Sequence, residues 1–383
     1  MLTRRFFIAS GGASAALASV AFPRMAFASA NTQRRFVFII QRGAADGLAI
    51  VAPTGDPAFR GLRGAFADDL AGGARLDSFF TLHPALPETA KLYSAKQALF
   101  VHATASPYRD RSHFDGQNVL ETGGSAAYRL NDGWMNRMLG LLPRDEAKAL
   151  ALSSTVPMAL RGSREVSSYA PSALPSASDD LLARVSKLYE GDQQLHALWT
   201  AAMETRMTAG DLAGGGGQNG AATGALAGKL LAGDGARIAM IETGGWDTHS
   251  GQRGRLAAQL RGLDQLVAAL KIGLGAQWAN TLIMVATEFG RTVAPNGTGG
   301  TDHGTASAAM LLGGAVAGGK VIADWPGLSR SALYEGRDLK PTTDLDALIA
   351  AALAQHYSLE PARVTATLFP ESRGSMPRQS LIA

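Results

Sequence analysis

The sequence predicts an α/β fold in which a mostly parallel central sheet carries helices on both faces. Four continuous apolar runs are typical of strands buried on both faces, at residues 35–40, 98–102, 237–241 and 281–286. Helical patterns lie between or after these runs, with apolar residues recurring every three or four positions over residues 181–208, 256–274 and 344–357. Strands that alternate with helices are typical of this fold class.

Each predicted strand leads into a polar loop. The loops are QRGAADG at residues 41–47, SPYRDRSH at 106–113, GGWDTH at 244–249 and TEFGRT at 287–292. In open parallel sheets, ligands bind beyond the carboxyl ends of the strands. We therefore expect these loops to converge in one neighbourhood.

The first thirty residues are typical of an export signal. They contain no acidic residue, carry TRRFFI at residues 3–8 and continue as a weakly apolar run to Phe22. This run is too short and too polar for a membrane-spanning helix, and its paired arginines predict a twin-arginine signal peptide over residues 1–30. We expect cleavage near Ser29 or Asn31, the twin-arginine translocase as the export partner, and a periplasmic protein. An uncleaved N-terminal anchor is the alternative.

The charge balance argues against nucleic acid as a partner. The 383-residue chain has 36 basic and 32 acidic residues, and without the arginines of the signal its net charge is about +1. Nucleic-acid binding requires a dense positive surface, and anionic lipid requires a basic tail. The sequence therefore predicts neither a nucleic-acid partner nor a stable membrane anchor.

The absence of cysteine restricts the chemistry. Thiolate nucleophiles and disulfides are excluded, and any metal must use oxygen and imidazole ligands. We expect residues 31–383 to form one domain, because the strand at 237–241 is expected to return to the same sheet. The Gly- and Ala-rich stretch 209–235 is expected to be a flexible connection, or helix ends around a mobile loop.

Acids and histidines collect at the predicted strand ends. The candidate metal ligands are Asp46, Asp247, His249, Glu288, Asp302 and His303. Several carboxylates in one cleft would repel one another unless a cation compensates them. The sequence therefore predicts one or two divalent ions, with zinc, manganese or calcium as the candidates.

Ser112 precedes a predicted helix over residues 116–121 and has two interpretations. A hydroxyl at a helix N-terminus can act as a nucleophile or a metal ligand, beside free N–H groups that favour an anion. It can equally be an N-cap serine. Arg111 and Arg291, with Arg109, could clamp a phosphate or sulfate, or pair with nearby acids instead.

Five ordered motifs resemble a known family. The matching stretches are residues 42–47, 111–115, 245–249, 288–292 and 299–304, followed by 336–339 and 343–344. The chain resembles the family named domain of unknown function 1501, and the likeness covers nearly all of the mature chain. That family in turn resembles the alkaline phosphatase and sulfatase superfamily.

The resemblance implies an alkaline phosphatase-like domain and a role for each motif. Asp46 matches the first metal carboxylate, and Asp247 with His249 resembles the middle ligand pair. His303, with Asp302, resembles the last ligand position. The nucleophile position falls on or beside Ser112, with His113 as its competitor. Glu288-Phe289 stands where phosphatases carry Asp-His, so a phenyl ring replaces one imidazole ligand.

The resulting hypothesis is an exported metal-dependent hydrolase of a small anionic ester, either a phosphate or a sulfate. The Phe289 departure favours an alternative, a non-catalytic envelope protein that keeps the fold and a metal or anion site for binding or structure. A cofactor-bound oxidoreductase would also fit the export route, but no glycine-rich dinucleotide fingerprint follows the first strand.

Overall fold

A nine-stranded sheet forms the centre of the computed structural model, which describes residues 33–143, 148–170, 179–209, 219–372, 374 and 379–383. The signal predicted at residues 1–30 lies outside the described residues. The strands in spatial order are β11 (Lys320–Ile322), β5 (Ala98–Ala105), β10 (Ser307–Leu312), β9 (Thr281–Ala286), β1 (Arg35–Gln41), β8 (Ile238–Thr243), β6 (Ala149–Leu152) and β7 (Val166–Ser168), with β12 (Thr343–Asp344) paired to β5.

The sheet is mostly parallel, as the sequence predicts. β1 pairs in parallel with β8 and β9, whereas β10 pairs antiparallel with both β9 and β5. Because β10 is antiparallel to both of its neighbours, those neighbours, β5 and β9, run in the same direction. The carboxyl ends of β5, β9, β1 and β8 therefore lie at the same edge as the start of β10.

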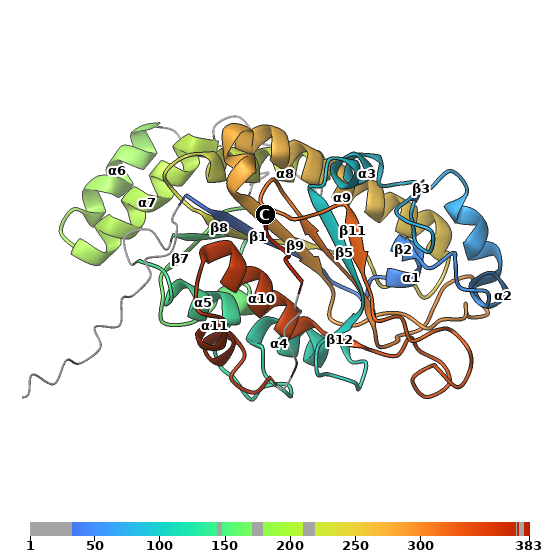
Figure 1. The fold of residues 1–383 in the computed structure, drawn as a ribbon. Coiled ribbons are helices and arrows are strands. Elements are labelled where there is room, and N and C mark those ends of the chain that lie inside the picture. Colours follow the sequence, from blue (N-terminus) through green and yellow to red (C-terminus); the bar gives the residue numbers. More distant parts are fainter. Residues whose placement is uncertain (1–32, 144–147, 171–178, 210–218, 373, 375–378) are drawn as a thin grey trace, which may run out of the picture.

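Helices cover both faces of the sheet (Figure 1). One face carries α3 (Pro87–Ser94), α8 (Gly220–Ala232) and α9 (Gln252–Leu274). The other carries α4 (His113–Thr122), α5 (Trp134–Leu139), α10 (Leu345–Tyr357) and α11 (Pro361–Leu368). Alternate residues of β1 serve the two cores: Phe36 and Phe38 pack on the α10 side, and Val37 and Ile39 on the α9 side. Both faces of β1 are buried, which explains its unbroken apolar sequence.

Of the two alternatives predicted for residues 209–235, a flexible connection is wrong for residues 220–232, because they form α8, and helix ends agree with α7 ending at Ala209 and α8 beginning at Gly220. Residues 210–218 lie outside the described residues. The glycines of α8 allow close packing on α9. A Cβ on Gly224 would lie 2.1 Å from the Leu266 carbonyl oxygen, and one on Gly228 would lie 2.7 Å from the Gly273 Cα. Glycine here provides backbone proximity rather than flexibility.

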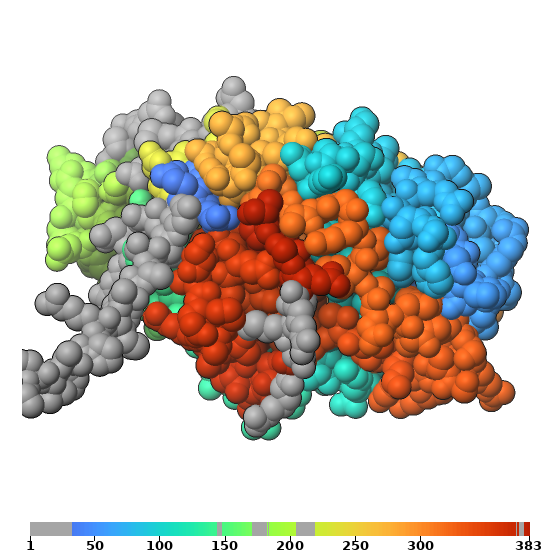
Figure 2. All heavy atoms as spheres, in the orientation of Figure 1, coloured from blue at the N-terminus to red at the C-terminus, as the bar shows by residue number. Residues whose placement is uncertain are grey.

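Two smaller groups of elements lie at opposite ends of the molecule (Figures 1 and 2). One end carries α6 (Asp179–Tyr189) and α7 (Gln193–Ala209). The sequence predicted a single helix over residues 181–208. The chain forms two helices instead, because Asp192 accepts hydrogen bonds from two amides in the first turn of α7 and so begins a new helix. The other end carries α1 (Gly47–Ile50), α2 (Phe59–Arg63) and a small sheet of β2 (Val51–Ala52), β3 (Ala74–Arg75) and β4 (Thr81–Leu82). Short 3-10 segments are η1 (Gly64–Leu70), η2 (Met158–Leu160) and η4 (Gly275–Asn280). Among the described residues, every helix is too short or too polar to cross a membrane.

Candidate metal centre

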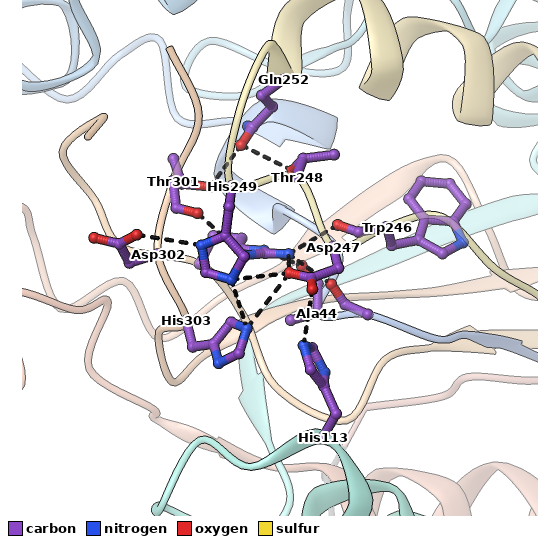
Figure 3. A network of polar contacts seen from close by, with 12 residues as sticks. Ala44, His113, Trp246, Asp247, Thr248, His249, Gln252, Thr301, Asp302 and His303 are labelled. Carbon is purple, nitrogen blue, oxygen red and sulfur yellow. Dashed lines mark hydrogen bonds and ion pairs between the residues drawn. The ribbon is translucent and has the colours of Figure 1, made fainter. Parts of the chain in front are cut away.

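Three imidazole rings and one carboxylate converge at the edge of the sheet where the strand ends meet (Figure 3). Asp247 follows β8, and one oxygen of its carboxylate lies 3.1 Å from His249 Nε2 and 3.4 Å from His303 Nε2. The other oxygen lies 3.5 Å from His113 Nε2. His249 Nε2 and His303 Nε2 are 2.9 Å apart. The Nε2 atoms of three rings thus face one carboxylate.

The second nitrogen of each ring faces an acceptor. These acceptors are Glu288 Oε1 at 2.9 Å from His113 Nδ1, Asp302 Oδ1 at 3.3 Å from His249 Nδ1, and the Arg111 carbonyl oxygen at 2.9 Å from His303 Nδ1. An acceptor opposite Nδ1 fixes the proton on that atom, so each neutral ring carries a bare lone pair on Nε2. This is the arrangement that orients histidine ligands around metal ions in proteins.

The converging ring nitrogens can be satisfied by a positive charge between them. His249 Nε2 and His303 Nε2 are 2.9 Å apart, a distance at which the two atoms share either a proton or a cation. His113 Nε2 is buried and has no hydrogen-bond partner among the described residues. A divalent cation would satisfy all of these atoms at once, and imidazole with carboxylate is a donor set that suits zinc and related ions. His113, Asp247 and His303 offer ligand atoms within 4.8 Å of one another, and these residues fit a metal ion. His249 lies outside this group, although its Nε2 is 3.1 Å from Asp247 Oδ1 and 2.9 Å from His303 Nε2.

Arg291 holds Asp247 in position from behind. Its guanidinium is buried, and Nη2 donates to Asp247 Oδ1 at 2.5 Å. Partial burial works against ionisation of Asp247, but the hydrogen bond and charge of Arg291 lower its pKa below the usual value. Asp247 is therefore a carboxylate at neutral pH, as a metal ligand must be.

Glu288 orients His113 instead of joining the converging atoms. Its side chain is fully buried, and Oε1 accepts hydrogen bonds from His113 Nδ1 at 2.9 Å, Gln117 Nε2 at 3.0 Å and the Gly43 amide at 2.8 Å. Burial opposes ionisation of Glu288, but these hydrogen bonds lower its pKa overall. The hydrogen bond to Glu288 also raises the pKa of His113.

Phe289 lies beneath the same histidine. Its ring stacks on the His113 ring with centroids 5.1 Å apart and an interplanar angle of 24°. The phenyl ring that replaces an expected imidazole ligand therefore supports another imidazole, which α4 supplies.

Asp46, predicted as a metal ligand, has other partners. Its carboxylate is almost wholly buried, forms an ion pair with Arg63, accepts from Gln252 Nε2 at 2.5 Å and caps α1 through the Ala49 amide. The group of possible metal ligands formed by the described residues does not include it. Arg63, seventeen residues further along the chain, neutralises this carboxylate.

Asp302 also contacts the Nδ1 side of a histidine instead of the converging Nε2 atoms. It is half-exposed, faces His249 Nδ1 and accepts from Asn296 Nδ2 at 3.1 Å. The hydrogen bond from Asn296 is the main reason that the pKa of Asp302 is lowered. Asp302 and Glu288 thus orient the histidines from behind.

The predicted arginine clamp pairs with acids, the second of the two alternatives left open by the sequence. Arg111 Nε donates to Asp338 Oδ2 at 2.9 Å, and its Nη2 pairs with Glu335. Arg291 has its other N–H groups on backbone carbonyl oxygens, including those of Gly43 and Ala44. Both guanidiniums position the backbone and the acids around the centre.

Ser112 precedes the first residue of α4, which begins at His113, three residues earlier than predicted. It occupies the N-cap position in extended conformation but makes no capping hydrogen bond with its side chain. Arg111 before it has φ 60°, a left-handed conformation that is rare for a non-glycine residue and that recurs at functional sites. The serine hydroxyl is therefore not committed to the cap.

His113 is the one converging residue that the sequence did not assign to metal binding, since it was considered only as a competing nucleophile. An Asp-x-His pair marks Asp247 and His249, but nothing in the sequence around His113 signals its partners. Its contact with Glu288 joins residues 175 positions apart. The sequence offered one signal for this contact: Glu288 and His113 each follow a strand that is predicted to end at the same edge of the sheet.

The fold and the converging residues define an α/β protein with a histidine-carboxylate centre able to bind a metal. The chain belongs to the family described as protein of unknown function (DUF1501), whose model matches residues 33–369. No curated protein matches the chain significantly in sequence.

Three solved structures illustrate the structural likeness. Ps i-CgsB has 13% identity and a TM-score of 0.39, with 85% of this chain and 72% of that chain covered. The phosphonate monoester hydrolase of Agrobacterium radiobacter has 10% identity and a TM-score of 0.32, covering 90% and 79%. BT1596, a 2-O GAG sulfatase, has 10% identity and a TM-score of 0.34, covering 91% and 76%. At TM-scores below 0.5 these likenesses assign no activity to this chain.

Proposed function

We propose that this protein is an exported metal-dependent hydrolase of a phosphate or sulfate ester. The observation that carries the proposal is the convergence of three Nε2 lone pairs on Asp247. This convergence lies beside the N-terminus of α4, where Ser112 is the N-cap residue. His113, His249, His303 and Asp247 would hold the metal. A divalent metal, when bound, lowers the pKa of a nearby hydroxyl and polarises an ester oxygen.

The first turn of α4 supports recognition of an anion. The amides of residues 113–115 donate to no acceptor within the part of the chain that the structure describes, whereas the Gly116 amide donates to the Ser112 carbonyl oxygen. Free N–H groups at a helix N-terminus favour a phosphate or sulfate oxygen. His113 belongs to this turn, so an anion bound there would lie next to the metal centre.

Ser112 is the proposed nucleophile. Its amide donates to the Tyr108 hydroxyl at 3.1 Å, which fixes the backbone, and its side chain is free of the capping role. Attack by the serine oxygen on phosphorus or sulfur would form a covalent ester and release the alcohol, and water would then cleave that ester. His113 follows directly in the chain, so the backbone of Ser112 adjoins a proposed metal ligand.

A matched pair of serine variants tests this role. Purified mature protein, loaded with zinc or manganese, is assayed on aryl phosphate and aryl sulfate esters. We expect Ser112→Ala to lower kcat by at least about 100-fold at unchanged metal content, as for loss of a nucleophile. Ser94→Ala, on the exposed side of α3, is the control and should keep full activity. Full activity in Ser112→Ala would refute the assignment of the nucleophile.

The burial of Phe289 supports a second candidate function. A non-catalytic envelope protein would keep the metal centre, with His113 stacked on Phe289, for binding or structure. Wild-type protein that binds metal but hydrolyses neither class of ester would favour this alternative. Hydrolysis of either class would exclude it.

Export rests on the paired arginines Arg4 and Arg5. Because the twin-arginine route reads both side chains, Arg4→Lys with Arg5→Lys should leave the uncleaved protein in the cytoplasm. Fractionation of cells that express the two forms checks this. Periplasmic recovery of the double variant would contradict the twin-arginine route without affecting the proposed chemistry.

A further inference from the structure

We infer that this centre takes one divalent cation per chain, and that two buried arginines stand in place of a second. The inference rests on the metal centre of the proposed function, but not on ester hydrolysis. Four acids lie in the loops at this edge: Asp46, Asp247, Glu288 and the half-exposed Asp302. A two-metal centre would need ligand atoms from more than one of them.

Asp46 has no free ligand atom. One of its oxygens accepts from Arg63 and Gln252, and the other accepts from the Ala49 amide. Arg63 is itself fixed, since its Nη1 donates to the carbonyl oxygens of Thr292 at 3.3 Å and Val293 at 3.1 Å. Removing a guanidinium held in this way from a buried carboxylate would leave both charges unpaired.

Glu288 is equally occupied. Three donors share its Oε1, and its Oε2 lies 2.9 Å from the Thr287 hydroxyl, whose single hydrogen is shared with the Gln41 carbonyl oxygen at 2.7 Å. The side chain is fully buried, and this donor set already stabilises its charge. Its function is to hold the proton of His113 on Nδ1.

Arg291 occupies the space between the Asp46 loop and Asp247. Its guanidinium donates to the carbonyl oxygens of Gly43 and Ala44 from the first loop, and to Asp247 from the second. A cation placed among these oxygens would have to displace a buried guanidinium that already satisfies them. The position that would bridge the two acids is thus filled by this chain.

The charge count of these loop groups agrees. Four carboxylates, those of Asp46, Asp247, Glu288 and Asp302, against the guanidiniums of Arg63 and Arg291 leave two uncompensated negative charges. One divalent cation, held by neutral imidazoles, balances these charges. A second divalent cation would leave two uncompensated positive charges in the same loops.

Metal stoichiometry tests the inference independently of activity. Metal-free wild-type protein is titrated with Co²⁺, followed by its visible absorption, and bound metal is then counted by elemental analysis after gel filtration. We expect saturation at one equivalent per chain. Saturation at two equivalents, or no binding, would overturn the inference. One equivalent without ester turnover would refute the proposed function alone.

Two matched aspartate variants locate the ion. Asp247→Asn should abolish Co²⁺ uptake, whereas Asp46→Asn should keep one equivalent. The double variant Asp46→Asn with Arg63→Met replaces Asp46→Asn if the single variant does not fold, because it removes both members of the buried pair. Loss of the metal from the folded Asp46 variant would make Asp46 a ligand and overturn the inference.

Discussion

Asp46 and Asp247 occupy comparable places but have opposite surroundings. Each follows one of two neighbouring parallel strands, β1 and β8, in a loop that contains glycine. The side chain of Asp46 is 1% exposed and paired with Arg63, whereas that of Asp247 is 45% exposed and faces three imidazole nitrogens. The same residue type at the same edge forms a buried ion pair in one loop, whereas in the other it pairs with Arg291 and remains partly exposed beside the three rings.

The difference shows that the neighbours decide what a carboxylate can do. A guanidinium brings its own charge and hydrogens, so the pair needs nothing from outside. Imidazoles with Nδ1 protonated bring only lone pairs, so Asp247 and its neighbours could hold a cation. Arg291 donates to Asp247 Oδ1, the oxygen that also lies near His249 Nε2 and His303 Nε2, and Oδ2 faces His113 Nε2.

The largest expected effect is a loss of folding stability on substitution of Asp46. Asp46→Asn should lower the free energy of unfolding by about 3–5 kcal/mol, because it leaves the buried guanidinium of Arg63 without a counter-charge. Urea unfolding of metal-free protein measures this. Adding Arg63→Met should recover part of the loss. An Asp46→Asn variant as stable as wild type would contradict the description of a buried ion pair.

The next effect concerns the ligands. His113→Ala should weaken metal binding by more than about 100-fold, a larger loss than removal of an orienting group causes. At a metal concentration 100 times the Kd, wild type should gain about 2.7 kcal/mol of stability that this variant does not gain. His196→Ala, on the exposed α7 helix, is the control and should bind metal like wild type. Equal metal affinity in His113→Ala would remove His113 from the centre.

Orienting acids should have intermediate effects. Asp302→Asn and Glu288→Gln should each weaken metal binding by about 10–100-fold, since they loosen the rings of His249 and His113 without removing a ligand. Calorimetric titration with Zn²⁺ measures the change. Asp324→Asn, at an exposed position, is the matched control. An unchanged affinity in both variants would show that the rings are held by other contacts.

The smallest effect concerns histidines away from the centre. Burial lowers the pKa of His102 to about 4 and that of His356 to about 3. Both stay neutral in the fold but take up a proton on unfolding below about pH 6.5, so stability must fall as the pH is lowered. Between pH 7 and 5.5 each ring should account for roughly 1 kcal/mol.

Urea midpoints at the two pH values check this effect. His102→Gln should reduce the loss of stability between pH 7 and 5.5 by the contribution of one histidine, roughly 1 kcal/mol. A pH dependence in His102→Gln equal to that of wild type would contradict the burial of His102 in neutral form. The metal-free protein is used so that competition between protons and metal does not contribute; His113, whose pKa is raised, titrates in both proteins, so their difference isolates one ring.

The central strands were predictable because their sequences repeat one simple signal. β1 and β9 lie within one residue of their predicted bounds, since a strand buried on both faces must be continuously apolar. The sequence did not indicate that β10 is reversed, because pairing direction depends on the connection and not on the strand itself. Nor did it show that the glycines of α8 pack on α9, since glycine is also typical of loops.

The site was predictable to the level of the sheet edge and no further. The loops were expected to converge, and Asp247, His249 and His303 lie together there. The pairing of Asp46 with Arg63 and the arrival of His113 opposite Glu288 depend on how α2 and α4 pack. Those are tertiary contacts that leave no local pattern in the sequence.

Anomalous diffraction from crystals grown with zinc would locate the bound ion. We expect one anomalous peak per chain, within about 2.0–2.3 Å of an Asp247 oxygen and of the Nε2 atoms of His113, His249 and His303. A peak beside Asp46, a second strong peak near Arg291, or no peak among the three rings would contradict this expectation.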